Sequence, residues 1–284
     1  MRRTLFPFVL AAFAVALSSV SARADLKIVT QMKVTGAPEA AQGQVPPTTT
    51  TFIKGDRVRV EQGKTITITD YKSNVIVTLD PVKKTYSEMN LNALTDAAKN
   101  PMMAMFKMDV KADVKPTGKT KELLGRTVKE YKYSATVSMS VDPNAGEDTP
   151  LPPGIADMLP TVMISGENWV SDTIQFPIDP NKLMSQSMQG MLSMFGAGMK
   201  DFQEKMAAIP GYPLETRTLV EVVFPPTAPK EMIGETPGPV TTTTTVTSIS
   251  EEPLPDSLFD IPADYEKVTG PALPIPGADN DGPR

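Results

Sequence analysis

Apolar and polar residues alternate along much of this chain, beginning at residues 26–34. Alternation with a period of two over that length predicts a strand with one buried face and one solvent-facing side. Lys27, Gln31 and Lys33 fall on the polar side. The residues expected on the buried face are Leu26, Ile28, Thr30, Met32 and Val34.

A series of short β-prone segments follows a stretch rich in proline and alanine (residues 37–47). Turn-forming residues such as Lys54-Gly55-Asp56 and Asp80-Pro81 separate these segments. Strands this close in sequence pair with their neighbours as an antiparallel meander. The predicted short strands are residues 48–53, 57–61, 65–70, 74–79 and 84–89, and longer strands are predicted at residues 129–141, 161–169, 214–224 and 241–249.

Two segments have helical rather than alternating spacing. Residues 90–107 predict a short helix, in which Pro101 must start, kink or end a turn. Residues 179–208 predict a long helix, which Asp179 can cap and Pro180 can begin. Its apolar residues recur every three or four positions as one stripe, namely Met184, Met188, Met191, Phe195, Met199, Phe202 and Met206. Gly190, Gly196 and Gly198 weaken or bend this helix.

These elements predict an α+β fold that is mainly β. We expect a curved antiparallel sheet with the long methionine-rich helix and the shorter helix packed on one face. No linker divides the chain, so residues 25–269 are expected to form a single domain. Residues 142–160 are expected to form a long loop, and residues 270–284, rich in Pro, Gly and Asp, are expected to be a disordered tail.

The first 24 residues have the order of a secretory signal peptide. Arg2 and Arg3 precede an apolar run at residues 5–17, and Ala22-Arg23-Ala24 provides a cleavage site. We therefore expect cleavage before Asp25 and a periplasmic or secreted protein, exported by either the general or the twin-arginine route. No later segment approaches ~20 consecutive apolar residues, so no transmembrane segment is expected after cleavage.

Charge and composition exclude several classes of function. Without residues 1–24 the chain has 25 basic and 33 acidic residues, a balance of −8 that argues against nucleic acid and anionic headgroups as partners. The chain contains no cysteine and no histidine. These absences exclude disulfides, Ser-His-Asp and Cys-His catalysis and the usual zinc ligands. We expect no cofactor, no metal and no enzymatic activity.

Several longer segments resemble a known family. They are residues 52–61 (FIKGDRVRVE), 79–86 (LDPVKKTY), 125–131 (GRTVKEY), 211–214 (GYPL) and 258–265 (LFDIPADY). Their order is similar to the secreted bacterial domain-of-unknown-function family 4412 and, more distantly, to the LolA/LolB-like lipoprotein carriers. The resemblance implies an incomplete β-barrel, or half-barrel, with helices on its concave face and an apolar cavity between them. It implies no particular activity. The length of the methionine-rich helix and the loop at residues 142–160 depart from the pattern.

The methionine stripe is the main candidate for a binding site, because methionine side chains adapt to varied apolar guests. The residues predicted to bind a ligand are Met184, Met188, Met191, Phe195, Met199 and Phe202. The expected ligand is a lipid, an acyl chain or an apolar segment of an envelope protein. Alternatively, the stripe only packs on the sheet, and the protein is a non-catalytic envelope scaffold whose helix fills its own barrel.

Two sets of charged residues suggest other functions. Arg57 and Arg59 alternate with valines and either bind an anionic group or pair with acidic residues on neighbouring strands. Asp70 and Asp80 represent the carboxylate pairs that a glycosidase would need, although their spacing does not select them over ordinary surface residues. A carboxylate-dependent hydrolase is therefore a third hypothesis, after the binding protein and the scaffold.

Overall fold

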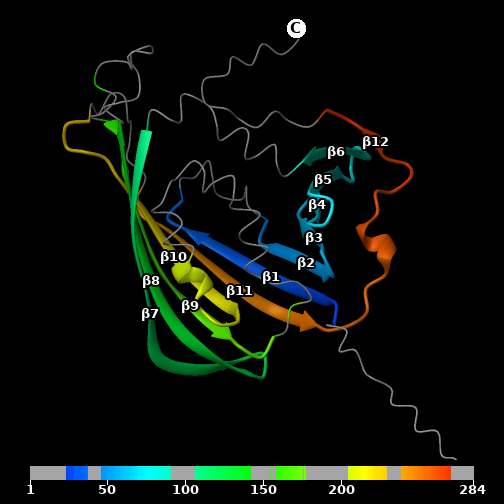
Figure 1. Cartoon of the computed structure of the whole chain (residues 1–284), viewed down its shortest axis with the longest axis horizontal. Coiled ribbons are helices and arrows are strands. Elements are labelled where there is room, and N and C mark those ends of the chain that lie inside the picture. The colour runs from blue at the N-terminus through cyan, green and yellow to red at the C-terminus, as the bar shows by residue number, and fades with distance from the viewer. Residues whose placement is uncertain are drawn as a thin grey trace, which may run out of the picture.

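One twelve-stranded sheet contains most of the residues that the structure describes. The computed structural model describes residues 24–37, 46–90, 106–141, 154, 158–174, 176, 204–228 and 238–269. The strands are β1 (Leu26–Thr35), β2 (Thr48–Lys54), β3 (Arg57–Gln62), β4 (Thr65–Asp70), β5 (Val75–Asp80), β6 (Thr85–Asn90), β7 (Phe106–Leu123), β8 (Arg126–Val141), β9 (Thr161–Ser171), β10 (Tyr212–Val223), β11 (Val240–Ser250) and β12 (Glu266–Lys267). Their order across the sheet is β12-β6-β5-β4-β3-β2-β1-β11-β10-β9-β8-β7 (Figure 1).

Strands β2–β6 form the predicted antiparallel meander, in which each strand pairs with the next along the chain. Tight turns join them because their turn residues tolerate left-handed backbone conformations. Gly55 and Gly63 have φ angles of 53° and 59°, and Asn74 has 57°. The predicted short strands are therefore confirmed, with ends that differ by no more than a residue from the predicted ones.

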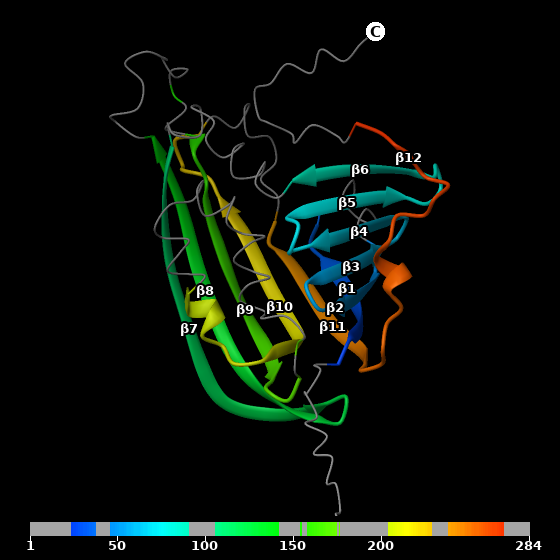
Figure 2. The same cartoon turned by 45° about the vertical axis from the view of Figure 1, so that its right-hand side comes forward.

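Long strands form the other half of the sheet, from β11 to the edge strand β7. β1 joins the halves because it pairs with β2 on one side and with β11 on the other. The pairing of β1 with β11 places Lys27 directly opposite Ser250, so strands far apart in the sequence are neighbours in the sheet. Figure 2 shows β7–β10 standing steeply while β4–β6, to their right, run nearly horizontally, so the sheet is strongly curved.

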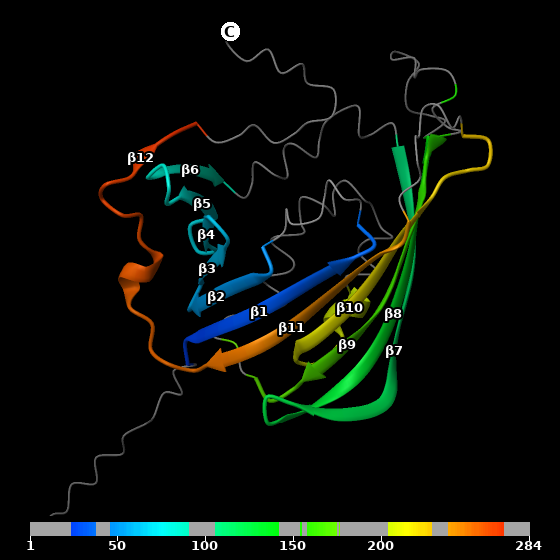
Figure 3. The same ribbon diagram turned by 180° about the vertical axis from the view of Figure 1, so that it is seen from behind.

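The two faces of the curved sheet are covered by different segments. A helical turn at residues 204–207 lies on the concave face, in front of β9 and β10 in Figure 1 and behind them in Figure 3. Cross-strand register places Leu26 beside Ile53 and Val58 on this face. Phe52, which precedes Ile53 in β2, therefore points to the convex face.

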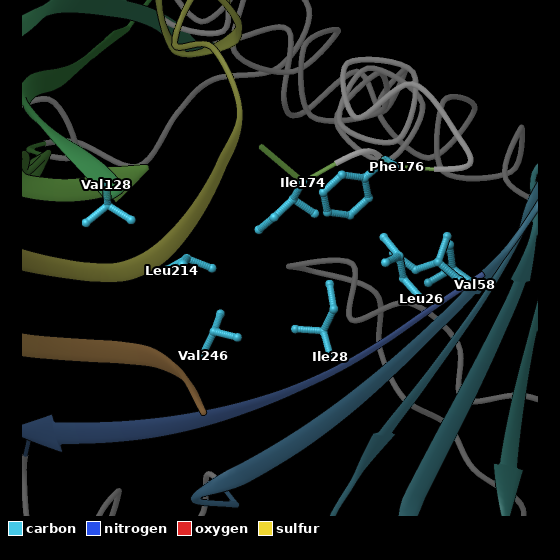
Figure 4. Close-up of a cluster of buried hydrophobic side chains, with 9 residues drawn as sticks. Leu26, Ile28, Val58, Val128, Ile174, Phe176, Leu214 and Val246 are labelled. Carbon is cyan, nitrogen blue, oxygen red and sulfur yellow. The ribbon is translucent and has the colours of Figure 1, made fainter. Parts of the chain in front are cut away.

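An inner core joins the two halves of the sheet (Figure 4). It combines residues from β1, β2, β3, β8, β10 and β11 with two residues that follow β9. Its members are Leu26, Ile28, Ile53, Val58, Val128, Ile174, Phe176, Leu214 and Val246. Burial of such apolar side chains is the main favourable contribution to folding, so this cluster holds β1 and β11 against β8.

A second core lies on the convex face of the meander, under residues 254–265, here named the C-terminal strap. Phe259 of the strap, in the short helix η3 (Asp256–Phe259), is 7% exposed. After the strap, the Glu266 N–H donates to the Lys84 carbonyl at 2.9 Å, and β12 pairs in parallel with β6. The buried residues of this outer core are Phe52, Ile68, Val77, Leu79 and Phe259.

The predicted α+β class is wrong for the residues that the structure describes. They are almost entirely strand, none of their helices reaches seven residues, and the β12–β6 pair makes the sheet mixed rather than purely antiparallel. Hydrophobic periodicity shows which side chains would share a face of a helix, but not whether the helix forms.

Several predicted segments lie partly or wholly outside the described residues. Of the long helix at 179–208, only the end is described, as the turn at residues 204–207. Of the short helix at 90–107, residues 91–105 lie outside, while Asn90 ends β6 and Phe106 begins β7. Residues 1–23, nearly all of the loop at 142–160, and the tail at 270–284 are also outside.

Candidate functional site

The predicted ligand-binding residues are not placed by the structure. Met184, Met188, Met191, Phe195, Met199 and Phe202 all lie outside the described residues. Met206, the last member of the stripe, is described and is half-buried in the turn at residues 204–207. The predicted cavity, which the stripe was expected to line, should therefore lie on the concave face beneath this turn.

A cavity of about 220 Å³ lies between this turn and strands β7 and β8. Apolar atoms dominate its wall. It is lined by Val114, Pro116, Tyr131, Lys205, Ala208 and Ile209. Val114 and Pro116 are alternate residues of β7 and therefore share a face of the sheet. Tyr131 of β8 lies on the same face, because it is directly opposite Pro116.

The turn is tied to the edge strand through a lysine. The Lys205 ammonium group donates a hydrogen bond to the Ala112 carbonyl of β7 at 2.7 Å. Within the turn, the Ala208 N–H donates to the Glu204 carbonyl at 3.0 Å, which is the spacing of a helical bond. These bonds place Lys205, Ala208 and Ile209 on the side that lines the cavity, since residues three and four apart share a helical face.

A buried amide lies on the strand next to the cavity wall. Asn168 of β9 is opposite Tyr131 of β8 on the concave face, and its side chain is 6% exposed. Its side-chain carbonyl oxygen has no hydrogen-bond partner. An unpaired buried oxygen costs about 1–3 kcal/mol. Asn168 is not among the residues that line the cavity, and lies on the strand beside its wall.

The sequence contained a signal for this residue that periodicity did not reveal. Asn168 falls within the predicted strand at residues 161–169, and asparagine is depleted in strands because its side chain competes for backbone hydrogen bonds. Val170, two residues further along the same face of the strand, is also buried. A polar residue on a buried strand face is a candidate for function.

A tyrosine closes the concave face two residues further along β8. The ring of Tyr133 lies over Gly166, so a Cβ at Gly166 would be 2.5 Å from the Tyr133 hydroxyl. That hydroxyl shares a hydrogen bond of 2.6 Å with Thr218 of β10. Burial raises the pKa of Tyr133 above its ordinary value. Tyr133 therefore spans β9 and packs the sheet where Gly166 leaves room.

A larger, more polar groove of about 330 Å³ lies on the opposite, convex face. Lys132, Glu167 and Arg217 align across β8, β9 and β10 along it. Arg217 and Lys132 are exposed and Glu167 is half-buried. A row of solvated charges suits polar groups rather than an apolar ligand, so the concave cavity is the better candidate.

Arg57 and Arg59 bind the protein's own C-terminal strap. Arg57 forms an ion pair with Asp256 at 2.5 Å and lies 4.9 Å from the centre of the Phe259 ring. Arg59 donates to the Leu258 carbonyl at 2.9 Å and pairs with Glu61 at 2.8 Å. Pairing with acidic residues on neighbouring strands was one of the two expectations. The acidic partners lie elsewhere, since Asp256 belongs to the strap and Glu61 to the same strand as Arg59.

Asp70 and Asp80 each serve their own turn. Asp70 accepts hydrogen bonds from the backbone N–H groups of Lys72 and Ser73, and Asp80 accepts them from Val82 and Lys83. Burial alone would raise the pKa of Asp70, but the two N–H bonds outweigh it and lower that pKa.

The pKa of Asp80 is also lowered, chiefly by the backbone N–H of Lys83. Both carboxylates are therefore ionised at neutral pH, which does not suit a general acid. Their positions are those of turn-stabilising residues.

Two other kinds of feature are absent from the described residues. In these residues no group of three or more carboxylates is placed to hold a metal ion. None of the helices among them is both long and apolar enough to cross a membrane. No protein-family model and no curated protein matches this sequence.

Proposed function

We propose that this protein is a non-catalytic binding protein that holds an apolar ligand against the concave face of its sheet. The observation that supports this proposal is the apolar cavity under residues 204–209, with the unpaired oxygen of Asn168 on the neighbouring strand. Binding sites combine mostly apolar walls with a few polar groups that orient the ligand. The cavity has mostly apolar walls with Lys205 among its lining residues, and we propose that a bound ligand also reaches Asn168 on the neighbouring strand.

The size of the cavity limits the guest. A volume of about 220 Å³ lies below the ~300–1,000 Å³ of pockets for drug-sized ligands. It suits part of an acyl chain or one large apolar side chain of a partner segment. We therefore propose a ligand with a narrow apolar body and a hydrogen-bond donor, such as a hydroxyl or amide, near one end.

Uptake of a fluorescent fatty-acid analogue by the purified protein tests this proposal. Ala208→Phe places a ring where Ala208 lines the cavity, and we expect it to weaken binding at least about tenfold, because the apolar volume is filled. Ala208 is exposed to solvent along its other side, so folding is expected to survive. Ala207→Phe is the matched control, since Ala207 belongs to the same turn but does not line the cavity.

Asn168→Leu separates recognition of the polar end from apolar uptake. We expect a probe with a terminal hydroxyl to lose about tenfold in affinity, because one buried hydrogen bond contributes ~1 kcal/mol or more. A probe of the same length without a donor should bind unchanged. If wild type and Asn168→Leu bind both probes equally, Asn168 does not contact the ligand.

A scaffold remains the second candidate function, favoured by the small cavity and the filled inner core. A wild-type protein that takes up no probe, with Ala208→Phe more stable than wild type in a urea melt, would support the scaffold. Under that outcome the cavity is a packing defect, and filling it should stabilise the protein.

We also propose export to the periplasm or beyond, on the basis of the signal pattern at residues 1–24. The expected product begins at Asp25, because the Ala22-Arg23-Ala24 site ends there. Intact-mass measurement of the protein produced in a bacterial host with an envelope checks this. A protein that retains residues 1–24 and stays in the inner membrane would contradict it.

A further inference from the structure

β7 is the last strand of the sheet, and among the described residues it pairs only with β8 as a strand, although its Ala112 carbonyl also accepts a hydrogen bond from Lys205. Figure 3 shows it at the margin of the long-strand half. Its pairing with β8 is regular from Phe106 to Pro116, where an irregularity begins. A long regular edge presents backbone N–H and C=O groups that another strand can pair with.

The charges on this edge alternate in sign. Asp109, Lys111, Asp113 and Lys115 lie on the convex face, opposite Ser138, Thr136, Ser134 and Lys132 of β8. Their side chains are between 55% and 82% exposed. Along the strand, Lys111 pairs with Asp109 at 3.8 Å and Lys115 with Asp113 at 2.6 Å. Acids and bases thus follow each other at every second residue.

Such a pattern is self-complementary in an antiparallel pair. When two copies pair about Val110, Asp109 of one copy lies opposite Lys111 of the other, twice by symmetry. When they pair about Lys111, the two Lys111 residues lie opposite each other, and Asp109 of one copy lies opposite Asp113 of the other. Opposite charges directly across two strands stabilise a pair and like charges destabilise it, by similar amounts, so the charges select the first register over the second.

Pairing about Ala112 would also match the charges, but it would bring Pro116 opposite residue 108. Proline has no backbone N–H and marks the end of usable edges. Pairing about Val110 uses residues 106–114, all before the irregularity at Pro116. The regular part of the edge therefore favours the register centred on Val110.

We propose that β7 pairs antiparallel with β7 of a second copy of this chain, centred on Val110, to form a two-fold symmetric dimer. The sheet then continues across the dimer. Asp109 of each copy forms an ion pair with Lys111 of the other on the convex face. On the concave face, the Val110 residues of the two copies lie directly opposite each other.

Single cysteines test the register directly, because the chain has no cysteine of its own. Residues directly opposite on antiparallel strands have Cα atoms ~4.5–5.5 Å apart, within the range of a disulfide. Val110 itself is only 6% exposed, so the exposed pair beside it is used: a mixture of the Asp109→Cys and Lys111→Cys proteins should crosslink on mild oxidation by oxidised glutathione. Ala112→Cys is the matched control, since the two copies of residue 112 would be ~13 Å apart, which a disulfide cannot span.

Charge reversal tests the ion pairs. Lys111→Asp places two carboxylates opposite each other on both sides of the axis, and we expect the dimer dissociation constant to rise about tenfold in sedimentation equilibrium. Asp109→Lys combined with Lys111→Asp restores the opposite charges, so the double variant should return to within about threefold of wild type. Lys111→Asp with Asp113→Lys matches only the register centred on Ala112 and should not recover.

The proposal is overturned if the wild-type protein is monomeric at every concentration tested. It is equally overturned if Ala112→Cys crosslinks and the mixture of Asp109→Cys and Lys111→Cys does not, or if both double variants weaken the dimer alike. Thermal melts of each variant check folding, and the exposed charges are expected to change the melting midpoint little. Because ligand uptake is measured separately on the concave face, either proposal can fail without the other.

Discussion

Strands β2–β6 and strands β7–β10 belong to one sheet, but their convex faces differ. The C-terminal strap covers the convex face of the meander, where Arg57 and Arg59 are bonded to it. On the long strands, the described residues leave Lys132, Glu167 and Arg217 in an open groove. Charged residues on the convex face therefore have different roles in the two halves, because the strap covers one half and the groove leaves the other open.

The concave faces differ as well. The meander contributes Ile53 and Val58 to the filled inner core. The long strands instead leave a cavity and the unpaired Asn168 under residues 204–209. We infer that the meander and strap provide stability, while the long strands provide the binding surface and the free edge. Three further predictions test this division.

The largest effect is expected from Phe259→Ala in the strap. Phe259 fills the outer core and lies under Arg57, and truncation of a buried Phe costs ~3–5 kcal/mol. Urea melts should show this loss, and hydrogen exchange should show faster exchange in β3–β5 than in β8 and β9. Ser257→Ala, at an exposed position of the same helix, is the control and should cost almost nothing. Uniformly faster exchange across both halves would show that the strap stabilises the whole sheet and would remove the distinction.

A smaller effect is expected from Gly166→Ala in the long strands. Its new Cβ would lie 2.3 Å from the Arg217 carbonyl oxygen and 2.5 Å from the Tyr133 hydroxyl. Either the backbone or Tyr133 must then move, at a cost of ~1–3 kcal/mol in the free energy of unfolding. Thermal melts check this against Ser165→Ala, which removes an exposed hydroxyl on the other face. If both variants melt together, Tyr133 does not depend on the space that Gly166 leaves.

The smallest effect is expected at Glu130, where a bulge of β7 folds over β8. The Thr117 hydroxyl donates a hydrogen bond to the Glu130 carboxylate at 2.6 Å, and this bond lowers the pKa of Glu130, with help from Lys119 at 3.5 Å. A lowered folded-state pKa means stability that is present above the ordinary pKa and lost as pH falls through the lowered value.

Thr117→Val should therefore raise the pKa of Glu130 toward its ordinary value and cost ~1 kcal/mol at neutral pH. The cost should shrink as acid protonates the carboxylate. A carboxyl NMR titration and urea melts at neutral and acid pH measure both changes, with the exposed Thr120→Val as the control. A pKa that does not move would assign the shift to Lys119 instead.

Local patterns predicted the strands well because a strand's alternation and its turns are properties of neighbouring residues. β4 (Thr65–Asp70) was predicted with the ends that the structure shows. The short helix predicted at 90–107 overlaps the start of β7, because methionines and alanines suit a helical period, while the strand at 106–107 depends on pairing with β8. Nothing local indicated that residues 266–267 would pair with β6.

The candidate site was less predictable than the fold. Periodicity placed the binding surface on the methionine stripe, whose six predicted site residues lie outside the described residues, and of the predicted helix only its end, Lys205 and Ala208, lines the described cavity. Asn168 was missed because a pattern assigns it a strand face without showing what surrounds that face. The roles of Arg57 and Arg59 were left open for the same reason, since their partners are about 200 residues away.

The sequence by itself determined the strands from β1 to β6, most of the later long strands, and the absence of cysteine and histidine chemistry, since these follow from residue types and near neighbours. Only the tertiary structure decided that β1 lies between β2 and β11 and that the strap covers the meander. It also decided that the concave face retains a cavity beside an unpaired amide. These features depend on contacts between residues far apart in the chain, and their energies come from burial and register, which no local pattern contains.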